Sequence, residues 1–108
     1  MNKFHNKVAK QVVSKLRGMY PNGYNQGDEV LVPLNSVAYC RALIKNSNDH
    51  SGRGYNVVGP DSWDPWERWV RLEHIRPTKM YDLIEMYCIE DYRERDKIEK
   101  RVMELLYE

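Results

Sequence analysis

The sequence predicts an α+β fold, in which a small five-stranded β-barrel is flanked by an N-terminal amphipathic helix and a C-terminal helix or helix pair. Short runs with alternating apolar residues fill residues 27–77, which is the pattern of half-buried strands. Apolar residues recur at helical spacing on both sides, in residues 3–17 and 79–107. The length of 108 residues is that of one compact domain, so we expect a single domain over 1–108.

The first helix is expected over residues 3–17, with Gly18 ending it. Its apolar stripe consists of Phe4, Val8, Val12 and Leu16. Its basic residues are Lys3, Lys7, Lys10, Lys15 and Arg17. No acid lies among them, so the helix either covers the barrel with its apolar side or binds nucleic acid or an anionic surface with its basic side.

The strands are expected in chain order at residues 27–32, 38–45, 55–58, 68–72 and 75–77. In the second strand, period-two alternation assigns Cys40, Ala42 and Ile44 to the core face. The polar loop at 46–54 is expected to be mobile, with its His50 in solvent.

The connection at residues 61–66 holds two tryptophans, Trp63 and Trp66, on either side of Asp64-Pro65. A barrel of this size does not readily bury both rings, so at least one is expected on the surface, where exposed Trp indicates binding. The alternative is that one ring closes the barrel's end and the other covers a terminal helix. Trp69 falls within a strand and is assigned to the scaffold.

The C-terminal segment, residues 79–107, is acidic and helical. The interval at 90–97 holds no Gly or Pro, which favours one continuous helix over two. The apolar residues that follow this interval are Ile98, Val102, Leu105 and Leu106. They form a candidate homodimer surface, and the acidic segment is also expected to pack against the basic first segment.

The cysteines Cys40 and Cys88 are expected to be buried free thiols, and no spacing suggests a metal ligand set or a cofactor. No apolar run approaches the roughly 20 residues that span a bilayer. The first seven residues lack the apolar stretch of a secretory signal. The sequence therefore favours a cytoplasmic location.

The strand runs read Gly-Asp-x-Val-x-Val from Gly27, Tyr-Cys-Arg-Ala-Leu-Ile from Tyr39, Tyr-x-Val-Val from Tyr55, Trp-Val from Trp69 and Ile-Arg-Pro from Ile75. In this order they resemble the SH3-like barrel of Tudor and Agenet-type domains over residues 27–77. Family members that read methylated Lys or Arg use a cage of aromatic rings. Here Gly59-Pro60 stands where a cage aromatic is expected, and other SH3-like barrels bind nucleic acid or protein surfaces. The resemblance therefore implies a fold and leaves the ligand open.

Catalysis is the least expected function, because the three histidines are scattered and no nucleophile, phosphate loop or carboxylate pair is recognisable. The leading hypothesis is a protein-binding module, a small adaptor or an inhibitor of the kind a phage or mobile element encodes. Its expected contact residues are Tyr39, Tyr55, Trp63, Trp66 and Arg68. These are residue types that dominate interface energies.

Nucleic-acid binding is the alternative. Besides the basic residues of the first helix, it would use Arg41, Lys45, Arg53, Arg71 and Arg76. Aromatic rings would be available for stacking on bases.

Overall fold

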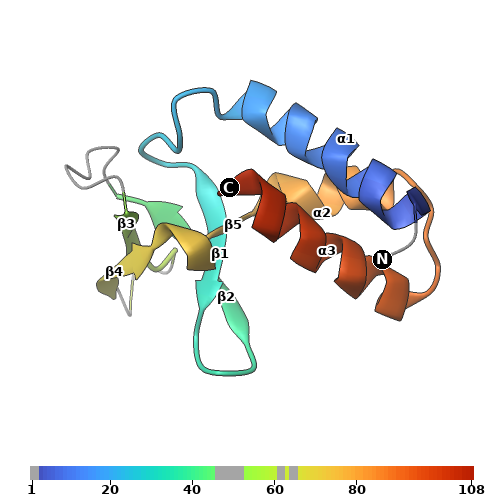
Figure 1. The fold of residues 1–108 in the computed structure, drawn as a ribbon. Coiled ribbons are helices and arrows are strands. Elements are labelled where there is room, and N and C mark those ends of the chain that lie inside the picture. Colours follow the sequence, from blue (N-terminus) through green and yellow to red (C-terminus); the bar gives the residue numbers. More distant parts are fainter. Residues whose placement is uncertain (1–2, 46–52, 61–62, 64–65) are drawn as a thin grey trace. The chain divides into compact units, whose positions relative to one another are not determined.

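The computed structural model describes residues 3–45, 53–60, 63 and 66–108, and they form two compact units. The sheet unit is continuous in sequence, from Asn22 to Thr78. The helical unit combines the two ends of the chain, Met1–Pro21 and Lys79–Glu108. The structure therefore confirms a mixed α+β chain. Along the sequence, one helix precedes the run of strands and two helices follow it (Figure 1).

The sheet unit holds one antiparallel sheet of five strands in the order β4-β3-β2-β1-β5. The strands are β1 (Glu29–Pro33), β2 (Tyr39–Ile44), β3 (Gly54–Val58), β4 (Glu67–Arg71) and β5 (Arg76–Pro77). Each expected strand is present within two residues of its predicted bounds. Among the described residues β4 and β5 are the edges of the sheet and do not pair with each other, so closure into a barrel stays a prediction.

One face of this sheet carries the core of the unit. In β1, Val30 and Val32 are buried while the alternate residues Glu29, Leu31 and Pro33 are half-buried. In β2, Ala42 and Ile44 are buried and Cys40 is half-buried on the same face. Strands with period-two side chains bury alternate positions, so the face assignment made from the sequence is confirmed.

The helical unit packs α1 (Lys3–Met19) against α2 (Thr78–Glu85) and α3 (Tyr92–Leu106). Its core is drawn from all three helices and includes Val8, Val12, Leu16, Met80, Ile84, Ile98 and Val102. Two expectations for α1 are corrected. The helix runs through Gly18 to Met19, and Phe4 is exposed instead of joining the buried stripe.

The expectation of one continuous C-terminal helix is wrong, because α2 and α3 are separate. The chain turns after Glu85, and Cys88 adopts a left-handed backbone with φ of 54°, which an α-helix does not allow. Asp91 then begins α3 by accepting a hydrogen bond from the Arg93 backbone N–H at 2.9 Å. Helix-favouring residues flank this break, so the tertiary packing of two short helices overrides their propensity.

Cys88 lies exposed in this connection, so its expected burial is wrong. Cys40 is half-buried, and both cysteines are free.

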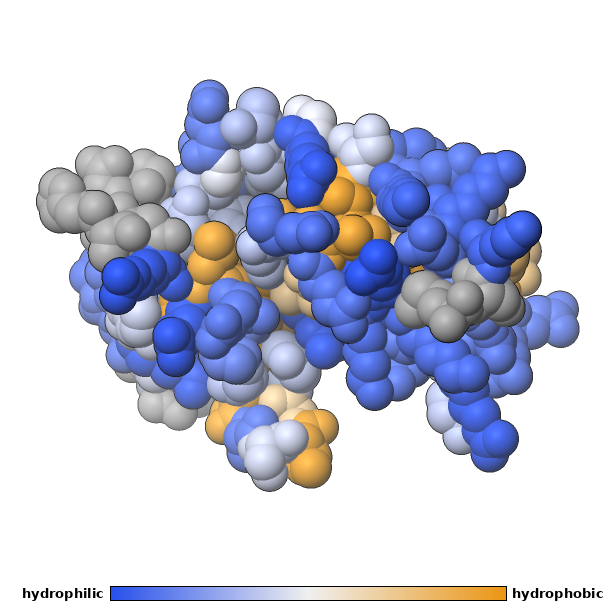
Figure 2. Space-filling model, in the orientation of Figure 1, coloured by the Kyte–Doolittle hydropathy of each residue, from blue (hydrophilic) through white to orange (hydrophobic). Residues whose placement is uncertain are grey.

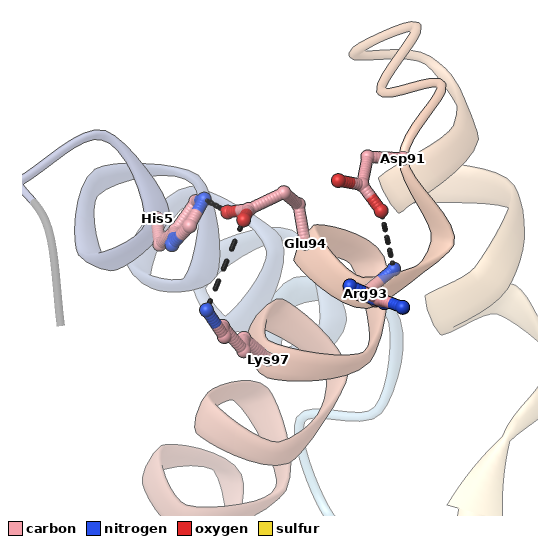
Figure 3. A network of polar contacts seen from close by, with 5 residues as sticks. All are labelled: His5, Asp91, Arg93, Glu94 and Lys97. Atoms are coloured by element: carbon pink, nitrogen blue, oxygen red, sulfur yellow. Dashed lines mark hydrogen bonds and ion pairs between the residues drawn. The ribbon is translucent and has the colours of Figure 1, made fainter.

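Polar contacts also join α1 to α3 (Figure 3). The buried His5 on α1 pairs through Nε2 with Glu94 on α3, and Lys97 lies 3.8 Å from the same carboxylate. Near the other end of α1, Arg17 donates to the Leu105 backbone carbonyl at 2.9 Å. The expectation that the basic and acidic ends of the chain pack together is therefore confirmed.

This packing covers the apolar residues that were expected to form a dimer surface. Ile98 and Val102 are fully buried, and Leu105 and Leu106 are partly buried against the same core. Dimerisation stays a prediction, but Ile98 and Val102 are not available for it. No helix in the described part of the chain has the length and apolarity needed to cross a membrane.

Candidate protein-binding surface

Two connections of the sheet lie at the same end, which we call the binding end. β1 runs toward this end and β2 runs away from it, so the turn formed by residues 34–38 is placed there. β3 is antiparallel to β2 and therefore also runs toward the binding end, from which β4 returns. The connection that holds Trp63 and Trp66 thus leaves from the same end as the β1–β2 turn.

The β1–β2 turn is held by the side chain of Asn35. Its Oδ1 accepts hydrogen bonds from the backbone N–H groups of Val37 and Ala38, both at 2.9 Å. The Leu34 N–H donates to the Ala38 carbonyl at 2.8 Å and closes the base of the turn. An Asn whose side chain accepts hydrogen bonds from the backbone of its own turn is a recurring local motif. Here these bonds give the tip of the hairpin a defined backbone conformation.

The ordered turn presents apolar side chains to solvent. Val37 is 90% exposed and Leu34 is 59% exposed. Figure 2 shows hydrophobic residues on both sides of the tip of the β1–β2 hairpin, at the bottom of the view, with more hydrophilic residues between them. Tyr39 begins β2 beside this tip and is itself exposed.

The second connection adds the most exposed ring in the described part of the chain. Trp63 is 91% exposed, which confirms the expectation that at least one of the two loop tryptophans lies on the surface. The neighbours Asp61, Ser62, Asp64 and Pro65 lie outside the described residues.

Trp66 is placed differently. Its indole lies against the backbone of Gly59, where an added Cβ would come within 2.5 Å of the indole Nε1. The guanidinium of Arg68 lies over the ring, 5.0 Å from its centroid. A ring stacked between a glycine and an arginine is part of the scaffold, so the two loop tryptophans have separate roles.

Arg68 also bridges strands that are not neighbours in the sheet. From β4 it donates a hydrogen bond through Nη2 to the backbone carbonyl of Pro33 at the end of β1. Tyr39 pairs with Pro33 in register, and the guanidinium of Arg76 lies 4.3 Å from the centroid of the Tyr39 ring. Stacked guanidinium groups hold aromatic side chains in place, so these contacts tie Tyr39 and Trp66 to the sheet.

Of the five residues expected to contact a partner, four lie at the binding end and one does not. The exception, Tyr55, is the second residue of β3 and lies at the opposite end of that strand. Its ring packs edge-on against Tyr24 at 5.5 Å, and its hydroxyl accepts a hydrogen bond from the Tyr24 N–H at 3.2 Å. Tyr55 thereby holds the segment that leads into β1.

Trp69 lies in β4, as expected for a scaffold residue, but its side chain is half-exposed. The indole covers Gly54 in the neighbouring strand, where an added Cβ would come within 2.6 Å of the ring. Gly54 therefore lets this ring lie flat on the sheet.

The basic residues of the nucleic-acid hypothesis fall into two groups. In the sheet unit, Arg41 pairs with Glu29 at 2.5 Å, Lys45 pairs with Glu67 at 2.7 Å, and Arg71 lies 3.6 Å from Glu73. Arg53 precedes β3, and Arg76 lies over Tyr39 as described. Carboxylates thus neutralise much of the charge that these residues were expected to offer.

The second group lies on α1 in the helical unit. It comprises Lys3, Lys7, Lys10, Lys15 and Arg17, all exposed. None of the four lysines has an ion-pair partner among the described residues.

The described residues do not assemble a metal site, since no three His, Cys, Asp or Glu side chains gather closely enough. Of the histidines, His5 is buried against Glu94 in the helical unit and His74 is exposed after β4. The sequence predicted that His50 lies in solvent and that the loop at 46–54 is mobile. Residues 46–52 of this loop, which include His50, lie outside the described residues.

Leu34 and Val37 were not among the expected contact residues. The signal that could have identified them is the run Pro-Leu-Asn-Ser-Val between two alternating strands. Turns are usually polar, so apolar residues on both sides of a turn-forming Asn-Ser pair indicate that the tip of the hairpin contacts a partner.

Comparison of the chain with protein-family models, with characterised proteins and with solved structures finds no match.

Proposed function

We propose that this chain is a non-enzymatic binding module that captures a protein partner through the binding end of its sheet. The observation that carries the proposal is the exposure of Leu34, Val37 and Tyr39 at the β1–β2 turn and of Trp63 in the β3–β4 connection, which leaves the sheet in the same direction. Single exposed apolar residues are common on proteins, whereas several exposed apolar side chains that include aromatic rings are typical of interaction sites.

The contacts beneath these side chains support the same function. Asn35 orders the turn backbone, and Arg68 ties β4 to the end of β1. A surface that its own hydrogen bonds order before a partner arrives loses little conformational entropy on binding, and this favours affinity. In this role the module acts as an adaptor or an inhibitor, because it occupies a partner's surface without chemistry of its own.

The contact set differs from the one expected from the sequence. Trp63 and Tyr39 remain in it, while Leu34 and Val37 join it. Trp66 and Arg68 support the surface from below, since both are engaged with the protein's own backbone.

An affinity purification from lysate of the source cells tests the proposal. The bait is the tagged chain, compared with the Leu34→Ser/Val37→Ser double variant and with Trp63→Ala. We expect the wild type to retain a discrete protein that both variants lose by tenfold or more, because the central apolar contacts of an interface carry most of its energy.

The matched control is Met86→Ser/Tyr92→Ser, which removes two comparably exposed apolar side chains from the helical unit. It should retain the partner as the wild type does. If the control loses the partner equally, or if the wild type retains no discrete protein, the proposal is wrong.

A further inference from the structure

The exposed side of α1 carries a straight stripe of positive charge. Lys3, Lys7, Lys10, Ser14 and Arg17 follow one another at intervals of three or four residues, and all are exposed. At about 100° per residue these positions fall within roughly 80° of the helix circumference, and at 1.5 Å per residue they extend over about 21 Å. We call Lys3, Lys7, Lys10 and Arg17 the cationic stripe; Lys15 projects from another side of the helix.

The lysines of the stripe differ from several other basic residues in the described part of the chain, which pair with carboxylates. Elsewhere Lys97 and Lys100 on α3 each lie next to an acid of the same helix, and Arg41 and Lys45 pair across strands. The lysines of the stripe have no such partner among the described residues. Since α1 contains no acid, the charge of these lysines is available to an external anion.

One acid lies near the stripe. Glu108 lines a groove of about 350 Å³ together with Lys10, Ser14 and Arg17. Arg17 also donates one hydrogen bond to the Leu105 carbonyl. The C-terminal half of the stripe is therefore weaker in charge than its N-terminal half, where Lys3, Lys7 and Lys10 lie.

We propose that the cationic stripe binds the phosphate backbone of double-stranded nucleic acid without regard to sequence. Three lysines at intervals of three or four residues, followed one turn beyond Ser14 by Arg17, place four cations over about 21 Å. Such a row matches an anionic polymer whose charges recur along its whole length, and displaced counterions supply the driving force. This surface belongs to the helical unit and the binding end belongs to the sheet unit, and the inference does not rest on the proposed protein-binding function.

The packing of α1 favours nucleic acid over a lipid surface. A helix that lies on a membrane inserts a continuous apolar face, whereas Val8, Val12 and Leu16 of α1 are already buried in the helical unit. The exposed apolar residues of α1, Phe4 and Met19, lie near its two ends and about 22 Å apart along the axis. They do not form a face that could enter a bilayer.

Fluorescence anisotropy with a labelled 20-base-pair DNA duplex tests the proposal, with the full chain titrated at 50 and 200 mM salt. Four phosphate contacts predict a fall in affinity of about 100-fold between the two salts. The variant Lys3→Gln/Lys7→Gln/Lys10→Gln should bind at least tenfold more weakly at 50 mM, and its affinity should change by less than about fivefold between the salts.

Two further variants separate charge position from net charge. Lys15→Gln/Lys79→Gln/Lys100→Gln removes the same number of positive charges from residues outside the stripe. It should bind the duplex within about threefold of wild type. The variant Lys3→Arg/Lys7→Arg/Lys10→Arg keeps the stripe and should bind as wild type does. Gln and Arg are good helix formers, and a far-UV circular dichroism melt of each variant checks that α1 is intact.

The proposal fails if the wild type does not bind the duplex at 50 mM salt, or if the off-stripe variant loses as much affinity as the stripe variant. It also fails if vesicles that contain phosphatidylserine compete the duplex away at equal phosphate concentration.

Discussion

The three tryptophans, which are alike in the sequence, occupy three different environments. Trp63 projects into solvent, Trp66 is held between Gly59 and Arg68, and Trp69 lies over Gly54. Trp66 and Trp69 each lie against a glycine, Gly59 just after β3 and Gly54 in β3, where the missing side chain leaves room for the indole.

This division predicts opposite outcomes for two single substitutions. Trp66→Ala should lower the free energy of unfolding by about 2 kcal/mol, less than the roughly 3–5 kcal/mol of a fully buried aromatic because Trp66 is only partly buried. Trp63→Ala should change it by less than about 0.5 kcal/mol. Urea denaturation followed by the remaining tryptophan fluorescence measures both, and equal losses would contradict the assignment.

At the scale of elements, the break between α2 and α3 determines how the C-terminal segment buries its apolar residues. The two helices contribute separate sets to one core, Met80 and Ile84 from α2 and Ile98 and Val102 from α3. The left-handed Cys88 and the capping Asp91 lie between them. Neither residue is a strong helix breaker, so the break becomes evident only when the core that both helices share is known.

The capping role of Asp91 predicts a measurable loss of stability. Asp91→Ala removes the acceptor of the Arg93 N–H and should cost about 1 kcal/mol in urea denaturation. The neighbouring Glu90 is exposed and does not cap the helix, so Glu90→Ala is the control and should cost less than about 0.3 kcal/mol. A similar loss in both variants would mean that the cap does not stabilise α3.

At the scale of the whole molecule, the helical unit is assembled from the two ends of the chain while the sheet unit is continuous. Removing residues 1–21 should therefore uncover Ile98 and Val102 and unfold the rest of the helical unit. Hydrogen exchange of the truncated chain should show protection lost in peptides from 79–108 and kept in peptides from 29–44. Protection kept in 79–108 would show that α1 is not needed for that core.

Much of the fold could be predicted from the sequence, because it depends on short-range patterns. Alternation places Val30, Val32, Ala42 and Ile44 on one face, and these residues are buried there. The charges of the two end segments predicted that these segments pack together, but not which apolar residues share the core, since apolar stripes match many partners equally well. The apolar face of α1 was expected against the strands and is buried with α2 and α3.

The candidate site was predictable in part for a similar reason. Residue type alone identifies Trp63 and Tyr39 as candidate contacts. It does not distinguish Arg68, whose guanidinium is engaged by the Pro33 carbonyl, from an arginine that is free to bind. Nor does it reveal Leu34 and Val37, which look like core residues until the hairpin register places them at a tip.

The central claim is that the binding end of the sheet contacts a protein, and site-specific photo-cross-linking tests it most directly. A photoreactive phenylalanine analogue replaces Val37 at the tip in one sample and the exposed Glu73 after β4 in another. After irradiation in the source cells, we predict a discrete cross-linked protein from position 37 that is absent from position 73. No adduct at position 37, or the same adducts from both positions, would contradict the claim.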